Sequence, residues 1–101
     1  MACRFEQGDI IKVENHRNPL LVVSKDTFNQ SGQALCCPLA RDVFPEPLHI
    51  RVQGSEISGT VLCEQIRFFD LRSRGYSKLD NLDLRTVMDI TDAIQGIFDY
   101  Y

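Results

Sequence analysis

The sequence predicts a small, mainly β fold with α structure at its end: a barrel or sandwich of short strands closed by a C-terminal helix. Over roughly the first four-fifths of the chain, short apolar runs alternate with turn residues, as in compact β folds. Over the last fifth, the hydrophobic period changes to that of a helix. With 101 residues, 44% hydrophobic and 25% charged, one globular domain over residues 1–101 is expected.

The N-terminal part is predicted to contain two strands joined by a polar turn. Residues 9–14 mix apolar and charged residues and form the first strand. Residues 15–18 are the turn, and the apolar run 20–23 after Pro19 suits a strand buried on both faces. Residues 25–32 are mostly polar and are expected to form a loop or a single helical turn.

Residues 34–39 form the predicted third strand, and Pro38 indicates its end or a sheet edge, because proline has no ladder donor. The neighbouring Cys36 and Cys37 are expected to point to opposite faces as buried, reduced thiols. No CxxC pair is present, so a zinc site is not expected. Residues 41–47 contain two prolines and several charges and are predicted to be a loop.

Two further strands are predicted after this loop. Residues 48–53 alternate strictly between apolar and polar types. Residues 60–66 follow a turn, and residues 68–70 continue that strand after a kink. In the alternating strand the inward side chains are Leu48, Ile50 and Val52, and the outward ones are His49, Arg51 and Gln53.

The last fifth is predicted to be a helix that closes one side of the barrel. Asp83 is a suitable N-cap, because its carboxylate can accept the free amide hydrogens of the first turn. Gly96 weakens the helix near its end, and Asp89, Asp92 and Asp99 form a solvated face. The predicted apolar face consists of Leu84, Val87, Met88, Thr91, Ile94, Ile97, Phe98 and Tyr101.

The charge distribution leaves room for a basic surface despite a net charge of −3. Residues 80–101 hold five acidic side chains against Arg85 alone, whereas residues 1–79 carry a surplus of one positive charge. No apolar run is long enough to span a bilayer, and the first residues do not resemble a signal peptide. A cytoplasmic location is therefore expected.

Short motifs follow one another through nearly the whole chain. The most specific is Gly59-Thr60-Val61-Leu62-Cys63-Glu64-Gln65-Ile66-Arg67, an apolar strand followed by acid-Gln-x-basic. The others are Gly8-Asp9-Ile10, Pro19-Leu20-Leu21-Val22-Val23-Ser24, Phe28-Asn29, Cys37-Pro38-Leu39, Phe69-Asp70 and Arg74-Gly75. In this order and spacing they resemble the MazF/PemK (Kid-like) toxin family of type II toxin–antitoxin systems.

The resemblance implies an SH3-like β-barrel, the fold of the MazF, PemK and CcdB toxins, with a C-terminal helix and assembly as a homodimer. The implied activity is sequence-specific, metal-independent cleavage of single-stranded RNA, often messenger RNA, which inhibits translation. The implied partner is a cognate antitoxin whose disordered acidic tail lies in the RNA groove. No cofactor and no membrane association are expected.

RNA cleavage without a metal needs a base for the 2′-hydroxyl, an acid for the leaving oxygen and cations for the phosphate. The turn after the first strand and the acid-Gln-x-Arg segment offer these groups, and the resemblance brings the two together. Histidine is a common acid or base at neutral pH, so His16 is a candidate for either role. Guanidinium suits phosphate, and Glu64 stands at the family's acidic position. The predicted catalytic set is His16, Arg17, Glu64 and Arg67.

Each of these residues also has a structural interpretation. His16 and Arg17 are equally explained as surface residues of a turn. Glu64 can instead bond turn amides or pair with Arg67, and Arg67 can be a structural ion-pair partner. His49 is predicted to be a plain surface residue.

Four further residues are predicted to contact RNA: Asn18, Arg41, Phe44 and Gln65. Phe44 either stacks on an unpaired base or anchors its loop, and Gln65 either holds a loop or reads a base edge. Asn18 and Ala40 depart from the family, which usually has arginine and then threonine or serine there. Because alanine cannot donate a hydrogen bond to phosphate, either Arg17, Arg41 and His16 substitute or cleavage is weak or absent.

Two alternatives from other functional classes fit the same fold. One is a binding toxin of the gyrase-poison type, which would inhibit DNA supercoiling and leave RNA intact. The other is a catalytically inactive interaction module, which would allow normal growth under strong expression.

Overall fold

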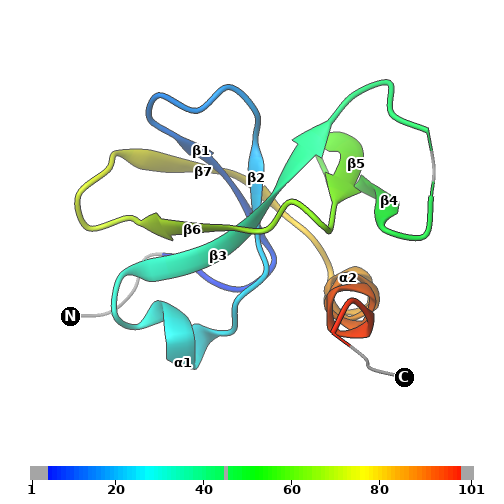
Figure 1. Ribbon diagram of the computed structural model, residues 1–101. Coiled ribbons are helices and arrows are strands. Elements are labelled where there is room, and N and C mark those ends of the chain that lie inside the picture. The colour runs from blue at the N-terminus through cyan, green and yellow to red at the C-terminus, as the bar shows by residue number, and fades with distance from the viewer. Residues whose placement is uncertain (1–4, 45, 99–101) are drawn as a thin grey trace.

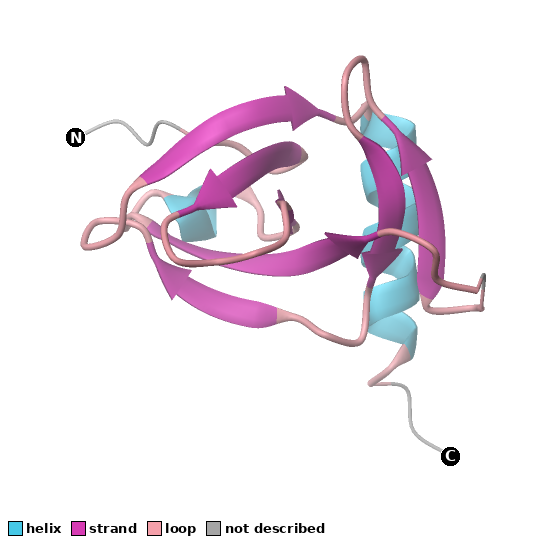
Figure 2. Ribbon diagram, turned by 90° about the horizontal axis from the view of Figure 1, so that it is seen from above, coloured by secondary structure: helices cyan, strands magenta, loops and turns pink. Residues whose placement is uncertain are grey.

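The computed structural model describes residues 5–44 and 46–98. Its strands are β1 (Asp9–Val13), β2 (Leu20–Val22), β3 (Gln33–Ala40), β4 (His49–Gln53), β5 (Ser58–Leu62), β6 (Arg67–Asp70) and β7 (Tyr76–Asn81), and its helices are α1 (Asp26–Asn29) and α2 (Leu84–Gly96). Within the described residues, seven strands form one sheet in the order β4-β5-β3-β2-β1-β7, with β6 paired to β3 (Figure 1). The sheet curls into a partial barrel, and α2 lies along one side of it (Figure 2).

The sheet buries a different hydrophobic cluster on each of its faces. The first core includes Ile10, Cys37 and Ile90, and α2 covers it. The second core, on the other face, includes Cys36 and Phe69. The predicted opposite orientation of the two thiols is therefore confirmed, while Cys3 lies outside the described residues. Burial raises the pKa of both thiols to about 12, so they stay protonated at neutral pH.

Several predicted elements are confirmed. β1 and β2 occupy the predicted runs, and every residue of β2 is buried. The polar segment after them contains α1, a single helical turn. In β4, Val52 is buried while Arg51 and Gln53 are exposed, and Leu48 and Ile50 pack against the first core.

Two predicted strand boundaries are wrong because one strand changes partner. β3 continues past Pro38 to Ala40, since β3 pairs with β6 as far as Cys36 and with β5 from Leu39 onward. On the side of β3 that changes partner, Pro38 lies in the gap between the β6 and β5 ladders, while on the other side it pairs with Leu20 of β2. The predicted strand over residues 60–66 is likewise too long, because β5 ends at Leu62, residues 63–66 form the connection, and β6 begins at Arg67.

The helix α2 has the predicted start, but the predicted apolar face is wrong in part. Asp83 caps the helix, accepting the backbone N–H of Thr86 at 2.9 Å. Val87 and Ile90 are buried, whereas Met88 is 50% exposed. Ile90 was not on the predicted face, so the buried face is rotated relative to the predicted one. Among the described residues of the predicted face, Leu84, Met88, Ile97 and Phe98 are exposed and only Val87 is fully buried.

The predicted solvated side of α2 agrees with the structure where it is described. Asp89 and Asp92 are exposed, and Asp99 and Tyr101 lie outside the described residues. None of the helices in residues 5–44 and 46–98 is long and apolar enough to cross a membrane.

The strand β7 was not predicted, and it anchors the β4–β5 hairpin through one carboxylate. Asp80 accepts the backbone N–H groups of Glu56 and Ile57 at 2.7 and 2.8 Å, and the hydroxyl of Ser55 at 3.0 Å. Gly54 permits this approach, because a Cβ there would lie 2.3 Å from the Asp80 carboxylate. The hairpin is thus fixed to β7, which pairs with β1.

We expect the Asp80→Asn variant to unfold at lower temperature than the wild type at pH 7, because the amide is a weaker acceptor for these donors. The backbone hydrogen bonds hold the pKa of Asp80 below its usual value. Its stabilising effect is therefore present above the ordinary aspartate pKa of about 4 and is lost as pH falls below it. Thermal unfolding at pH 7 and pH 3 should show the difference shrinking in acid. The exposed Asp92→Asn on α2 serves as control, and an equal loss there would contradict this role.

Candidate active site

The side of the sheet that buries the second core continues from β3 onto β5 and β4. Residues paired across a sheet project to the same side. Leu20 pairs with Pro38, whose side of β3 continues to Ala40 and from there to Thr60 on β5. Arg51 pairs with Thr60. The face therefore runs from the second core onto β4 and β5, and we call the part that carries β4 and β5 the open face.

The turn between β1 and β2 folds onto β6. The His16 ring meets the Phe69 ring edge-on, with 5.4 Å between centroids. Lys12 holds this turn by donating to the carbonyls of His16 and Arg17. Arg67 lies two residues before Phe69 and projects to the same side of β6. The structure thus brings the His16 turn to the strand that begins with Arg67.

A second imidazole pairs with the acidic residue of the acid-Gln-x-Arg motif. His49 Nε2 lies 3.1 Å from Glu64 Oε2. The alternative pairing of Glu64 with Arg67 is not found among the described residues. His49 is also not the plain surface residue that was predicted: its side chain is 17% exposed and also lies 3.3 Å from Glu46. Alternation correctly placed it on the outward side, but only the turn after β5 supplies its partner.

The His49–Glu64 pair shifts both pKa values in the direction of the charged forms. The hydrogen bond with Glu64 raises the pKa of His49, against an opposing effect of burial. Burial raises the pKa of Glu64, but hydrogen bonds from His49 and from the Gln65 side chain outweigh it and hold that pKa below its usual value. Glu64 is therefore an ionised carboxylate at neutral pH, and its side chain is 38% exposed.

A cleft of about 320 Å³ opens where the β1–β2 turn, the end of β3 and the β4–β5 hairpin meet. Pro19 and Ala40 line it, together with the basic Arg41 and Arg51 and the acidic Asp42 and Glu56. Arg51 was not among the predicted site residues. Its outward position was predicted, but its place in the same cleft as Arg41 depends on how the two hairpins pack.

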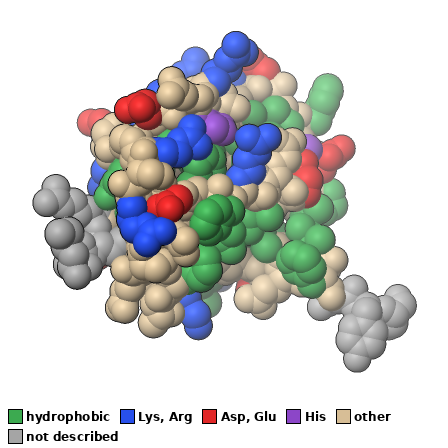
Figure 3. All heavy atoms as spheres, turned by 60° about the vertical axis from the view of Figure 1, so that its left-hand side comes forward, with side chains coloured by type: hydrophobic (Ala, Val, Ile, Leu, Met, Phe, Trp, Pro, Cys, Tyr) green, Lys and Arg blue, Asp and Glu red, His purple; other side chains and the backbone are tan. Residues whose placement is uncertain are grey.

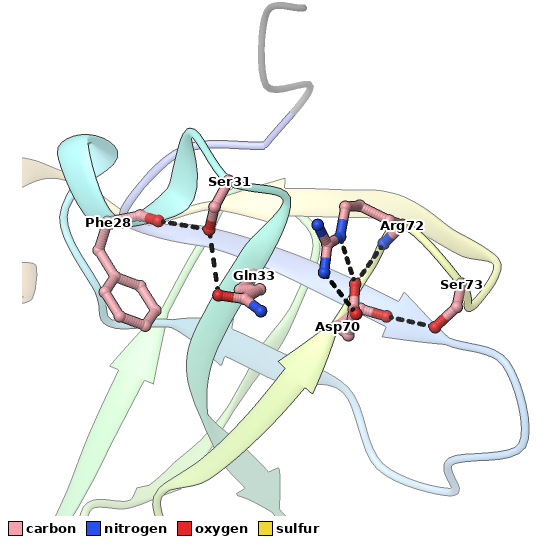
Figure 4. Close-up of polar contacts among 6 residues, drawn as sticks. All are labelled: Phe28, Ser31, Gln33, Asp70, Arg72 and Ser73. Carbon is pink, nitrogen blue, oxygen red and sulfur yellow. Dashed lines mark hydrogen bonds and ion pairs between the residues drawn. The ribbon is translucent and has the colours of Figure 1, made fainter.

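The basic side chains divide into paired and unpaired groups. The Arg72 guanidinium donates two hydrogen bonds to the Asp70 carboxylate, at 3.0 and 2.9 Å, and the Ser73 hydroxyl donates to the Asp70 carbonyl (Figure 4). Lys78 pairs with Asp9, and Arg74 donates to the Glu14 carbonyl. Lysine and arginine side chains spread over the face in Figure 3, with histidine between them. Within the described residues, the arginines without an ion-pair partner include Arg17, Arg41, Arg51 and Arg67.

The remaining predicted RNA-contacting residues lie around this region with few contacts of their own. Phe44 is 86% exposed in the loop before β4, so it does not anchor its loop by burial. Asn18 is half-buried beside Pro19. Gln65 is exposed, and its backbone N–H donates to the Leu62 carbonyl.

The curled sheet, the C-terminal helix, the His49–Glu64 pair and the cleft with Arg41 and Arg51 define a toxin-type barrel. Residues 3–98 match the family described as PemK-like, MazF-like toxin of type II toxin–antitoxin system, and the chain belongs to this family. It is 32% identical over 87 residues to the endoribonuclease toxin ChpB of Escherichia coli K12, covering 69% of this chain and 73% of ChpB.

Solved structures of the same fold support the architecture. A MazE–MazF crystal structure from Deinococcus radiodurans superposes with a TM-score of 0.83 at 21% identity, covering 96% of this chain and 97% of that one. A mycobacterial endoribonuclease in complex with its cognate antitoxin gives a TM-score of 0.80 at 16% identity, covering 96% and 99%. The predicted MazF-like barrel with a C-terminal helix is therefore confirmed.

Proposed function

We propose that this chain is a metal-independent endoribonuclease toxin that cleaves single-stranded RNA, including messenger RNA, in the cytoplasm. The observation that carries this proposal is the ionised Glu64 on a sheet face where Arg41, Arg51 and Arg67 have no ion-pair partner among the described residues. Guanidinium groups left free of carboxylates are available to phosphate oxygens.

The reaction needs three functions, and this face offers a group for each. Glu64 takes the proton of the 2′-hydroxyl, and the 2′-oxygen then attacks the adjacent phosphorus. Arg67 stabilises the additional negative charge on the phosphate oxygens. His16 gives a proton to the departing 5′-oxygen. The products are a 2′,3′-cyclic phosphate and a 5′-hydroxyl, with all protons accounted for.

Two family positions are altered, and neighbouring arginines compensate for them in this proposal. Asn18 and Ala40 stand at or beside the cleft where the family usually has arginine and a hydroxyl residue. Arg41 and Arg51 line the same cleft and supply the phosphate contacts that Asn18 and Ala40 lack. Arg17, Phe44 and Gln65 extend the surface for flanking nucleotides.

The test is digestion of mixed single-stranded RNA by the purified protein in EDTA. Fragments with 5′-hydroxyl and 2′,3′-cyclic phosphate ends are expected, and the Glu64→Gln variant should leave the RNA intact. RNA that stays intact at high concentrations of the wild-type protein would contradict the proposal. Toxicity on expression combined with intact RNA would indicate a binding toxin on the same scaffold.

The proposed partners are a cognate antitoxin with an acidic disordered tail and a second copy of this chain. The tail would occupy the open face, where its carboxylates meet the unpaired arginines. For the homodimer we propose the apolar surface beside the C-terminal half of α2. Phe68 there is 56% exposed and pairs with Leu35, which lines a hollow together with Ile66 and Ile94.

We expect the Phe68→Glu variant to sediment as a monomer at micromolar concentration where the wild type is a dimer, because a buried unpaired carboxylate is costly at an interface. Leu84→Glu is the control, since Leu84 is 72% exposed at the other end of α2. If Leu84→Glu dissociated the dimer and Phe68→Glu did not, the interface would lie at the N-terminal end of α2 and not at Phe68. A wild-type monomer would exclude the dimer at this concentration.

A further inference from the structure

We propose that His49 is a positioning residue for the reaction, holding the Glu64 carboxylate in place so that its exposed side meets the RNA 2′-hydroxyl. This inference rests on the proposed function and adds a residue to it. The sequence pattern marked His49 only as an outward side chain of an alternating strand.

Backbone pairing brings the turn that carries Glu64 next to His49. His49 pairs with Leu62 across β4 and β5, and the Cys63 N–H donates to the Leu48 carbonyl at 2.9 Å. The chain then turns, so that Glu64 reaches back over β4 to the imidazole. The contact thus joins two elements 15 residues apart in sequence.

His49, the positioning residue, is less exposed than Glu64, the group that meets the RNA. The His49 side chain is 17% exposed and that of Glu64 is 38% exposed. The imidazole is therefore the more buried partner, and the carboxylate remains accessible from solvent. A carboxylate in an exposed turn would otherwise rotate among several rotamers, and the contact with His49 restricts that freedom.

The charged groups around His49 favour the imidazolium form. Glu64 faces its Nε2 from the turn after β5, and Glu46 faces its Nδ1 from the loop before β4 at 3.3 Å, an ion-pair distance without hydrogen-bond geometry. Arg51 projects from the same strand two residues on, on the same side. The Cys37 and Cys63 thiols close to Glu64 have pKa values raised to about 12 and about 11, mainly by burial, and are neutral at physiological pH.

The imidazolium in turn keeps Glu64 ionised. Its hydrogen bond is the largest of the effects that lower the pKa of Glu64, so the base stays deprotonated to lower pH than a free glutamate would. Because the pKa of His49 is raised, this support persists to higher pH than an isolated histidine would allow. The titration of Glu64 should therefore set the lower limit, and that of His49 the upper limit, of the pH range in which Glu64 is ionised and held by the imidazolium.

The test compares His49→Gln with the wild type in the RNA assay over pH, with EDTA present throughout. Glutamine keeps a donor but loses the charge. We expect kcat to fall by up to about 10²-fold with KM nearly unchanged, and the acid limb of the kcat profile to move to higher pH. Gln53→Ala, an exposed outward residue of the same strand, is the control and should retain the wild-type profile. Unchanged kcat and acid limb in His49→Gln would overturn the inference while leaving the ribonuclease proposal intact.

An NMR titration of the imidazoles separates the two proposals independently of turnover. In the wild type one imidazole should titrate above the ordinary value of about 6.5, and in Glu64→Gln that same signal should move down toward it. Identical titrations in the two proteins would overturn the inference even if RNA is cleaved. Coupled titrations in a protein that leaves RNA intact would overturn the ribonuclease proposal, and the positioning role with it.

Discussion

Replacing Arg67 with alanine is expected to reduce RNA cleavage by about 10²- to 10³-fold, the loss seen when one donor to a transition-state anion is removed. Arg67 begins β6 on the side that His16 approaches through Phe69, and it is exposed. Its guanidinium can place two N–H groups on the phosphate oxygens as charge accumulates there. The measurement is the cleavage rate of a defined single-stranded RNA under single-turnover conditions.

Two further variants make the Arg67 result interpretable. Arg67→Lys keeps the charge but not the planar fork, so it should recover only part of the lost rate. Arg85→Ala removes an exposed arginine from α2, which covers the opposite face of the sheet, and should cleave at the wild-type rate. Unfolding should be nearly unchanged in all of these variants, because exposed and unpaired side chains contribute little to stability. Full activity of Arg67→Ala would remove Arg67 from the catalytic set.

Replacing Ile90 with alanine is expected to lower the free energy of unfolding by about 2–5 kcal/mol. Ile90 is completely buried, and it joins α2 to the first core together with Val87. The substitution leaves a cavity between helix and sheet, while alanine's helix propensity recovers only a few tenths of a kcal/mol. Urea unfolding at neutral pH measures the difference.

The matched control is Met88→Ala on the same helix. Met88 is 50% exposed, so its loss should cost about 0.5 kcal/mol or less. The helical period alone placed Met88 on the apolar face and left Ile90 off it. Greater destabilisation by Met88→Ala than by Ile90→Ala would therefore restore the face that the sequence indicated.

Local patterns in the sequence predicted most of the strands correctly, because those patterns are set by neighbours along the chain. Strict alternation identified β4 and its outward side. The neighbouring Cys36 and Cys37 had to point in opposite directions, because they lie on an extended strand. β7 was missed because its residues are largely polar. It is a strand because β1 offers it a free edge and because Asp80 ties it to the β4–β5 hairpin.

The candidate site was predicted in part for the same reason. The motif around Glu64 and the turn with His16 were found from the sequence, and the structure brings that turn onto β6. The catalytic roles of these residues stay predictions. Arg51 and His49 gave no local signal beyond outward alternation. Arg51 belongs to the site because it lines the cleft, and His49 because it contacts Glu64. Both features depend on segments that are distant in the sequence.

The sequence by itself determined most of the strands and the C-terminal helix, which side chains alternate, and which toxin family the motifs resemble. The tertiary structure alone decided that Glu64 pairs with His49, that Lys78 pairs with Asp9, and that Arg51 and Arg67 share one side of the sheet. The physical reason is the range of the interactions. Periodicity arises between residues a few positions apart, whereas ion pairs and sheet faces depend on the register of strands far apart in the chain.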